Sequence, residues 1–153
     1  MAIEAPLSKY KRNNFKIYIA VCLVLAAWFA YDGYLNKGFI EKHTDEEGTP
    51  EFALVFNQKA PPFLIGAAVL LGVCFFVVKD KKLVAGEDAL DVAGKLTIPY
   101  EAIEGIDKTH FKDKGVFTII YKDNNGPELR RKLSDRQYDN LEAILDHLVA
   151  KIT

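Results

Sequence analysis

Two long stretches without a charged residue dominate the pattern of hydrophobic and polar positions. Residues 17–31 and 60–78 contain no Asp, Glu, Lys or Arg, and neither shows a polar stripe at helical spacing. As a helix, the second stretch extends about 28 Å, close to the ~30 Å hydrocarbon thickness of a bilayer. The first reaches a similar length over residues 15–34, because a flanking lysine can extend its charge toward the headgroups. We therefore expect transmembrane helices at residues 15–34 and 60–78, the second with its two prolines, Pro61 and Pro62, in the first turn.

Two other structures could account for such stretches. One is a buried helix of a soluble protein, although most helices of a small soluble domain lie at its surface and carry a polar stripe. For the first stretch the other is a cleaved signal peptide, because the basic residues Lys9, Lys11 and Arg12 precede it. The bulky Trp28 and Phe29 do not suit a cleavage site, which requires small residues. An uncleaved membrane anchor is therefore expected.

The distribution of charge predicts the orientation of the helix pair. Residues 1–16 carry a net charge of +3, residues 32–62 of −3 and residues 79–153 of −1. Basic residues near transmembrane helices stay on the cytoplasmic side. We therefore expect a multi-pass protein of the inner (cytoplasmic) membrane with both termini cytoplasmic, a cytoplasmic segment at residues 1–14 and an external loop at residues 35–59. Within this loop, residues 51–56 fit either a short strand or a segment at the membrane interface.

Residues 79–153 show the pattern of a small antiparallel sheet followed by one helix. Five segments between turn residues are predicted as strands, namely residues 82–85, 89–93, 94–99, 116–121 and 128–133. Residues 101–107 place Ile103 and Ile106 near the strand at residues 116–121. Residues 86–88 and 122–127 predict turns. Ser134 fits the N-cap of a helix, and an apolar stripe from Tyr138 to Ile152 continues at helical spacing. This domain has few large apolar residues for its size, so we expect it to be marginally stable alone.

Four segments of the chain resemble a known family. IPYEAIEGIDKT (residues 98–109), KGVFTIIYKD (114–123) and RRKLSDRQYDNLEAILDHL (130–148) resemble the small bacterial PH-like domains that follow paired transmembrane helices. WFAYDGY (28–34) is similar to the end of the first helix in uncharacterised two-span bacterial membrane proteins. The resemblance implies two transmembrane helices followed by an antiparallel-sheet PH-like domain with a C-terminal helix over residues 79–153. Because fewer strands are predicted than the seven of a full PH barrel, we expect a partial or split version of that fold.

The sequence shows no motif for catalysis. A net charge of −1 and a pI near 6.3 argue against a nucleic-acid partner. A phosphate-binding glycine loop, a Walker lysine and a nucleophile elbow are missing, and His43, His110 and His147 lack metal-ligand spacing. Cys22 and Cys74 are interpreted as small apolar residues rather than as a metal or redox pair. We predict no catalytic residue, no cofactor, no metal and no small-molecule substrate. The opposing hypothesis is a membrane enzyme that uses His110 and Asp107.

Three features of the sequence could mediate contacts. The pairs Ala26/Ala30 and Ala68/Gly72 have a spacing that permits close helix packing. The dipeptide at residues 32–33 is either a functional contact or, as we expect, a place where Asp32 marks the water boundary and Gly33 ends the helix. Six basic residues could contact anionic lipid, although orientation alone already explains those that follow the second helix. They are Lys79, Lys81, Lys82, Arg130, Arg131 and Lys132.

These observations predict a non-catalytic accessory or scaffolding subunit of a larger membrane protein complex, with integral membrane proteins as partners. The two predicted transmembrane helices have no charged residue in their apolar stretches, the domain has a thin core, and the loop is longer than a simple connection needs. Each feature leaves surface that another chain could bury. The alternative is a membrane-anchored PH-like module that binds anionic lipid or a cytoplasmic partner.

Overall fold

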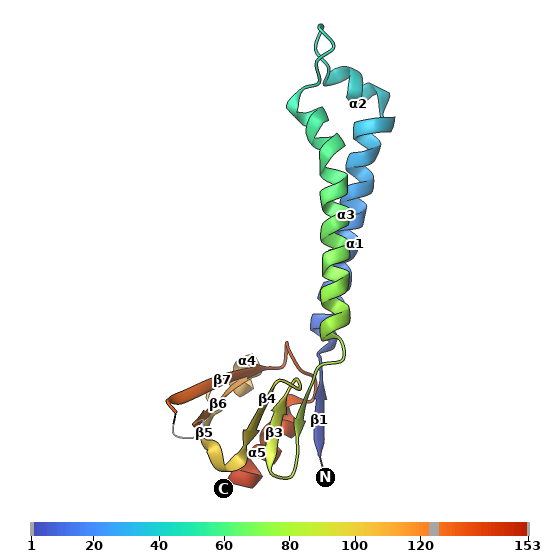
Figure 1. Cartoon of the computed structure of the whole chain (residues 1–153). Coiled ribbons are helices and arrows are strands. Elements are labelled where there is room, and N and C mark those ends of the chain that lie inside the picture. The colour runs from blue at the N-terminus through green and yellow to red at the C-terminus, as the bar shows by residue number, and fades with distance from the viewer. Residues whose placement is uncertain (1, 123–125, 153) are drawn as a thin grey trace. The chain divides into compact units, whose positions relative to one another are not determined.

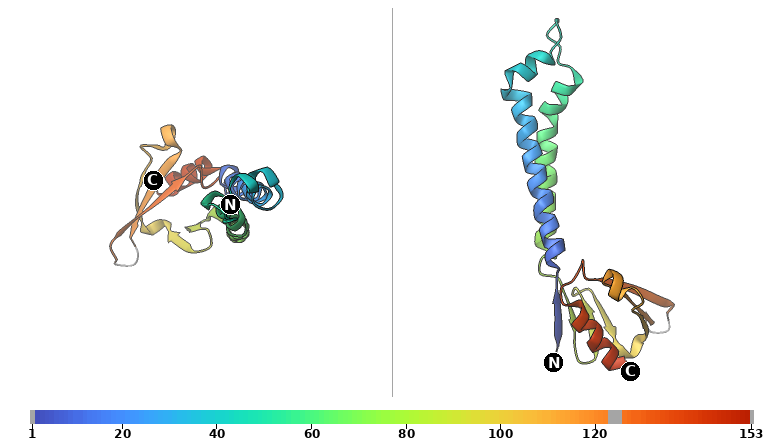
Figure 2. Two further views of the ribbon diagram at one scale, coloured as in Figure 1. Left: turned by 90° about the horizontal axis from the view of Figure 1, so that it is seen from above. Right: turned by 180° about the vertical axis from the view of Figure 1, so that it is seen from behind.

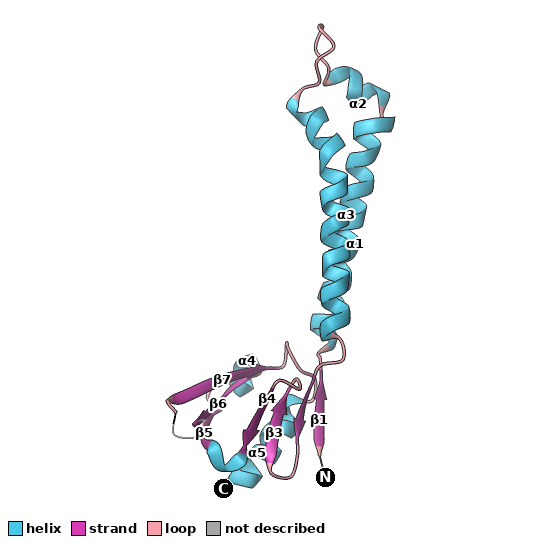
Figure 3. Cartoon of the chain, in the orientation of Figure 1, coloured by secondary structure: helices cyan, strands magenta, loops and turns pink. Residues whose placement is uncertain are grey.

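The chain forms two compact units in the computed structural model, which describes residues 2–122 and 126–152. One unit consists of residues 13–77 and is helical, whereas the other combines the residues before Asn13 with those after Val77 and contains all the strands (Figure 1, Figure 3). The residues on either side of the helix pair therefore belong to one unit, which we call the β domain.

The helical unit is an antiparallel pair of long helices. Helices α1 (Lys9–Ala30) and α3 (Phe52–Val78) are connected through a π-helical turn, η1 (Tyr31–Leu35), and a short helix, α2 (Lys37–Lys42). Phe15 contacts Phe75 with ring centroids 5.9 Å apart, and Phe29 contacts Phe56 at 5.4 Å, which sets the register of the pair. Both helices are long and apolar enough to cross a membrane, and most of their apolar surface is exposed.

Helix α1 begins at Lys9, six residues before the expected start. Ser8 caps it, because the Lys11 N–H donates to Ser8 Oγ at 3.1 Å and the Arg12 N–H donates to the Ser8 carbonyl at 3.0 Å. The apolar pattern located the apolar part of this helix, whereas the capped helix also includes the polar residues that precede it.

Helix α3 begins at Phe52, eight residues before the expected start. The short strand considered for residues 51–56 is therefore wrong. Pro61 and Pro62 lie inside the helix, not in its first turn where we expected them. Proline has no N–H, so the carbonyl groups four residues earlier lose their usual donors.

The turn η1 packs closely against this proline-containing part of α3. The Tyr34 hydroxyl donates to the carbonyl oxygen of Gln58 at 2.8 Å, and Gln58 Nε2 donates to the Gly33 carbonyl at 3.0 Å. Gly33 is buried, and a Cβ atom there would lie 2.9 Å from the backbone carbonyl carbon and oxygen of Asn57. The expectation that Gly33 ends the helix is therefore wrong, because the backbone continues as a π-helical turn that contacts α3. Asp32 accepts hydrogen bonds from Trp28 and Asn36.

The β domain contains two antiparallel sheets and one C-terminal helix. The first sheet has the order β1-β2-β3-β4 and the second the order β5-β6-β7. Helix α5 lies against β1 and β2 (Figure 2). The elements are β1 (Ile3–Pro6), β2 (Lys82–Ala85), β3 (Ala89–Val92), β4 (Leu96–Pro99), the 3-10 helix η2 (Tyr100–Ala102), β5 (Ile103–Asp107), α4 (Phe111–Lys114), β6 (Val116–Lys122), β7 (Glu128–Ser134) and α5 (Leu141–Ile152).

Strand β1 was not predicted, because the sequence analysis treated residues 1–14 as a separate segment. It pairs with β2 in a register that places Ala5 opposite Leu83, and both residues are fully buried. The segment is only four residues long and its partner lies 78 positions later, so no local pattern reveals it. The five strands that the sequence predicted all form, residues 103–107 form β5, and β1 is the seventh strand.

The start of the C-terminal helix was also predicted too early. Ser134 ends β7 instead of capping a helix, and α5 begins at Leu141. The intervening residues pair with the N-terminal segment, since Tyr138 forms a β-bridge with Leu7 and the Ser8 N–H donates to the Gln137 carbonyl at 2.9 Å. Of the turn predicted at residues 122–127, residues 123–125 lie outside the described part of the chain.

One hydrophobic core fills the space between the sheets and α5. Every strand contributes at least one buried side chain, and α5 contributes four residues of its apolar stripe. Strand β1 adds the buried Ala5 to this core, and Ile3 packs against it. Its buried members include Ala5, Leu83, Leu90, Ile98, Ile103, Phe117, Leu133, Leu141, Ile144, Leu145 and Leu148.

The pairing of β1 with β2 constrains the topology of the chain. One strand precedes the helix pair and the other follows it, yet they share backbone hydrogen bonds. Both ends must therefore lie on the same side of any membrane that the helices cross. A signal-peptide cleavage after the first helix would also remove β1 from the β domain.

Candidate functional site

The cavities of the β domain differ in the charge of their lining. One cavity, of about 790 Å³, lies beside α4 and is lined by three basic and four acidic residues, so it carries little net charge. A smaller cavity of about 320 Å³ is lined by four basic residues and by no carboxylate among the described residues. We call this smaller cavity the basic cleft. Its cations are Lys11, Lys81, Lys95 and Arg131, and its other lining residues are Leu7, Val78, Val92, Ala93, Leu96 and Tyr138.

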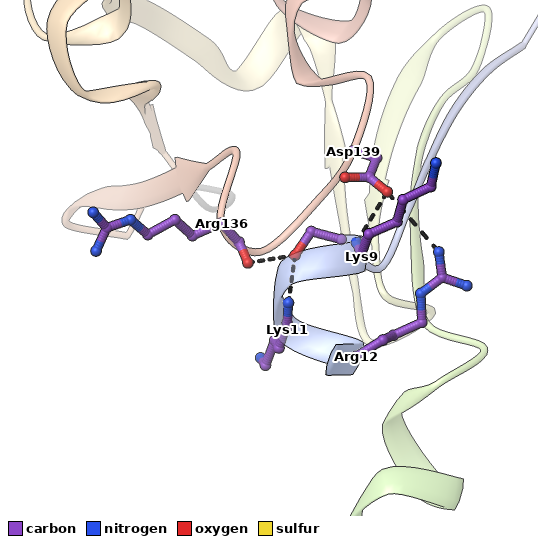
Figure 4. Close-up of polar contacts among 6 residues, drawn as sticks. Lys9, Lys11, Arg12, Arg136 and Asp139 are labelled. Atoms are coloured by element: carbon purple, nitrogen blue, oxygen red, sulfur yellow. Dashed lines mark hydrogen bonds and ion pairs between the residues drawn. The ribbon is translucent and has the colours of Figure 1, made fainter. Parts of the chain in front are cut away.

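The first turn of α1 positions Lys11. Ser8, whose hydroxyl caps this turn, also donates to the Arg136 carbonyl, and the Lys9 N–H donates to Asp139 Oδ2 at 3.1 Å (Figure 4). The Arg12 guanidinium lies 3.9 Å from the same carboxylate. The residues that follow β7 thus supply hydrogen-bond partners to the start of α1, and they fix Lys11 within the β domain.

Three other parts of the chain supply the remaining cations. Lys81 precedes β2, and its carbonyl accepts a hydrogen bond from the Leu7 N–H at 3.1 Å. Lys95 ends the turn between β3 and β4, where its N–H donates to the Val92 carbonyl at 3.2 Å. Arg131 lies on β7 opposite Ile119. Segments distant in the sequence therefore bring four positive charges to one cavity.

The cations of the basic cleft are not neutralised by neighbouring carboxylates. Elsewhere in the β domain a carboxylate accompanies several basic side chains, in the pairs Lys82–Glu4, Lys122–Glu104, Arg130–Glu128 and Arg12–Asp139. No ion pair among the described residues involves Lys11, Lys81, Lys95 or Arg131. The cleft is therefore a region of positive potential suited to an anion.

Tyr138 adds a hydrogen-bond donor to this cavity. Burial raises the pKa of its hydroxyl, and the Arg131 guanidinium nearby offsets part of that rise. The phenol therefore stays protonated at neutral pH and can donate to an anionic oxygen.

The structure separates the six basic residues that the sequence singled out for lipid contact. Only Lys81 and Arg131 line the basic cleft. Lys82 pairs with Glu4, and Arg130 pairs with Glu128. Lys132 lines two other cavities, because neighbouring residues of a strand point to opposite faces.

Sequence reasoning missed Lys11 and Lys95, the other two cations of the cleft. Lys95 stands in a turn predicted only as the start of a strand, and Lys11 was assigned to topology alone. No local pattern in the sequence indicates that these two lysines line the same cavity.

The structure also shows where Asp107 and the three histidines lie. Asp107 and His110 line one cavity of about 320 Å³ together with basic residues. Hydrogen bonds from the side chain and backbone of Thr109 lower the pKa of Asp107, which therefore stays ionised and is a poor general acid at neutral pH. Within residues 2–122 and 126–152, no group of three or more His, Cys, Asp or Glu residues could hold a metal ion. His43 pairs with Glu51 at 3.0 Å, and His147 contacts the Gly86 carbonyl at 3.1 Å.

In the helix pair, the two cysteines are far apart, and the small residues differ in how closely they are packed. Both cysteines are free thiols. The two phenylalanine contacts place Cys22 level with about residue 66, so it lies about 12 Å along the helix axis from Cys74. Ala26 and Ala68 are buried, whereas a Cβ at Gly72 would meet no atom within 4 Å.

Comparison with known proteins identifies no relative of this chain. No protein-family model matches it, and neither a curated protein nor a solved structure shows significant similarity.

Proposed function

We propose that the chain is a membrane-anchored, non-catalytic PH-like module that binds an anionic group in the basic cleft at the cytoplasmic face of the inner membrane. The observation that carries this proposal is the grouping of four cations, unpaired among the described residues, around one cavity. Like charges held together repel one another, so a bound anion lowers their electrostatic energy.

The architecture supports both the PH-like fold and the anchoring of the anion site close to a membrane. The β domain has seven strands in two sheets and a C-terminal helix, which is the strand count of a full PH barrel once β1 is included. Lys11 precedes Phe15 by four residues and Lys81 follows Val78 by three. At no more than ~3.6 Å per residue, both cations lie within about 15 Å of the apolar segments.

An accessory or scaffolding role in a larger membrane complex remains a prediction from the sequence. Of its three grounds, the thin core is the one on which β1 bears, because this strand adds the buried Ala5 to the core. The basic cleft is a specific feature of this chain, and it favours the binding module.

Titration calorimetry of the full chain in dodecyl maltoside with inorganic pyrophosphate tests the proposal. We expect the double variant Lys95→Gln/Arg131→Gln to lose at least about tenfold in affinity, because a hydrogen bond to a charged group contributes about 1.5–3 kcal/mol. The control Arg130→Gln/Lys132→Gln removes one Arg and one Lys that do not line the cleft. Equal losses in the two double variants, or no binding by the wild type, would contradict the proposal.

Cysteine labelling tests the orientation of the anchor. In a Cys22→Ala/Cys74→Ala background, Glu46→Cys should react with a membrane-impermeant maleimide from outside the cell, because the acidic loop is external. Ala2→Cys and Lys108→Cys should react only after the inner membrane is opened, and both should behave alike because the two residues belong to the β domain. Labelling of Lys108→Cys in intact cells would show that the orientation is wrong.

A further inference from the structure

The basic cleft has an apolar part beside its charged part. Five apolar residues line it together with the four cations. Leu7 and Val92 are buried, whereas Val78, Ala93 and Leu96 are partly exposed. A small inorganic anion would contact only the charged part, so the apolar residues indicate a ligand that is itself amphiphilic.

The turn between β3 and β4 places Ala93 in a strained conformation at this cavity. Ala93 and Gly94 have φ angles of +60° and +66°, and the turn is closed by the hydrogen bond from the Lys95 N–H to the Val92 carbonyl. Three residues connect the two strands, and the two with positive φ are the central pair of the turn from Val92 to Lys95. Asn and Gly are the residues that adopt such a pair of angles with least strain. A residue with a Cβ atom is strained at this φ, whereas Asn tolerates it better. The cleft therefore presents a methyl group where the backbone alone would favour a polar amide, and such strain is typical of ligand sites.

We infer that the basic cleft binds the headgroup of an anionic phospholipid from the bilayer in which the chain is itself anchored. The phosphate lies among the four cations, and the glycerol and first methylene groups contact Val78, Ala93 and Leu96. This inference rests on the proposed function and names the ligand class of the same site. The cavity volume of about 320 Å³ is at the lower end of small-molecule sites. It accommodates a headgroup, while the acyl chains remain in the membrane.

The position of the cleft along the chain favours a lipid over an acidic peptide or a free phosphate. Lys11 and Val78 belong to the two helices that connect the β domain to the apolar segments, so a lipid reaches the cleft without leaving the bilayer. The protonated Tyr138 hydroxyl can donate to a phosphate oxygen. A soluble anion would satisfy the cations and the hydroxyl but would leave the apolar residues unused.

Native mass spectrometry of the full chain, released from dodecyl maltoside micelles that contain equal amounts of phosphatidylglycerol and phosphatidylcholine, tests this inference. We expect phosphatidylglycerol adducts to exceed phosphatidylcholine adducts at least about fivefold, and Lys95→Gln/Arg131→Gln to lower their occupancy at least about tenfold. The control Arg130→Gln/Lys132→Gln should retain the adducts. The thermal unfolding midpoint of each variant shows whether its β domain is folded.

The variant Ala93→Asn separates the lipid inference from the proposed function. It relieves the strain of the turn, so the unfolding midpoint should rise. It also places an amide at the apolar part of the cleft, so phosphatidylglycerol occupancy should fall several-fold, and by a larger factor than any change in pyrophosphate affinity. Unchanged occupancy in Ala93→Asn would overturn the lipid inference.

The remaining outcomes are also decisive. Pyrophosphate binding without a preference for phosphatidylglycerol would leave the proposed function standing and overturn the lipid inference. Displacement of the lipid by a poly-glutamate peptide at a lower concentration than by glycerol 1-phosphate would overturn it in favour of an acidic peptide. A wild-type chain that binds neither pyrophosphate nor phosphatidylglycerol would overturn both proposals.

Discussion

The substitution Ala5→Asp is expected to unfold the β domain while the helix pair stays helical. Ala5 lies in β1, is fully buried and stands opposite Leu83. A carboxylate there would have no cationic partner within the core. An uncompensated buried charge costs about 3–5 kcal/mol, out of a total stability of about 5–15 kcal/mol for a typical domain. For a domain of this size the loss lowers the unfolding midpoint by roughly 12–40 °C.

Limited proteolysis of the purified chain in detergent, followed with temperature, measures this effect. Cleavage after residues of β2 to β7 should occur at much lower temperature in Ala5→Asp than in the wild type. The matched control is Glu4→Gln, which changes the neighbouring residue of the same strand. Glu4 is exposed and pairs with Lys82 at the surface, so its loss should cost less than about 1 kcal/mol. If Ala5→Asp resists protease as well as Glu4→Gln does, β1 is not part of the β domain.

The second large effect is expected for Gly33→Leu in the helical unit. A Cβ at Gly33 would lie 2.9 Å from the backbone carbonyl carbon and oxygen of Asn57, and backbone atoms cannot rotate away. Helix α3 and the turn η1 must separate, and the hydrogen bonds that Tyr34 and Gln58 make across this contact would break. Overpacking of this kind costs about 1–3 kcal/mol. The loss of the Tyr34 hydrogen bond adds a further cost, because Pro62 supplies no intrahelical N–H donor to the Gln58 carbonyl.

Crosslinking of Phe29→Cys to Phe56→Cys by a short bis-methanethiosulfonate reagent reports this separation, because the two rings they replace are in contact, with centroids 5.4 Å apart. In the background Cys22→Ala/Cys74→Ala, the reagent should join the two positions rapidly, and the reaction should become much slower once Gly33→Leu is added. Gly72→Leu is the matched control, since a Cβ at Gly72 meets no atom within 4 Å. Equal crosslinking in the two leucine variants would show that η1 does not contact α3.

Local patterns predicted the elements of this fold whose partners are close in the sequence. The alternation at residues 116–121 and the turn at residues 86–88 each depend on neighbouring positions, and both segments form as expected. The apolar stripe of α5 is correct from Leu141 onward. The errors occur where distant segments meet: Ser134 fits a helix cap by its own chemistry, but pairing between residues 137–139 and the N-terminal segment delays the helix.

The candidate site shows the same limit more strongly. Lys81 was noticed because it follows an apolar stretch, yet Lys82 is next to it and pairs with Glu4 of the unpredicted strand. The charge of Lys82 is neutralised by a carboxylate 78 positions away, and a local sequence pattern cannot relate two residues so far apart. Lys95 and Lys11 join the cleft only because the β3–β4 turn and the first turn of α1 meet in three dimensions.

The division of the β domain into one early and six late strands has a consequence for its synthesis. Strand β1 leaves the ribosome first, but its partner β2 is complete only 79 residues later. At a synthesis rate of ~5–20 residues per second, β1 therefore waits about 4–16 s with both of its edges unpaired. Its four-residue length, the charged Glu4 and the terminal Pro6 protect such an edge from pairing with other chains. In the proposed membrane topology, a nascent chain whose second helix does not return to the starting side cannot bury Ala5, so a folded β domain would also report correct insertion of the helix pair.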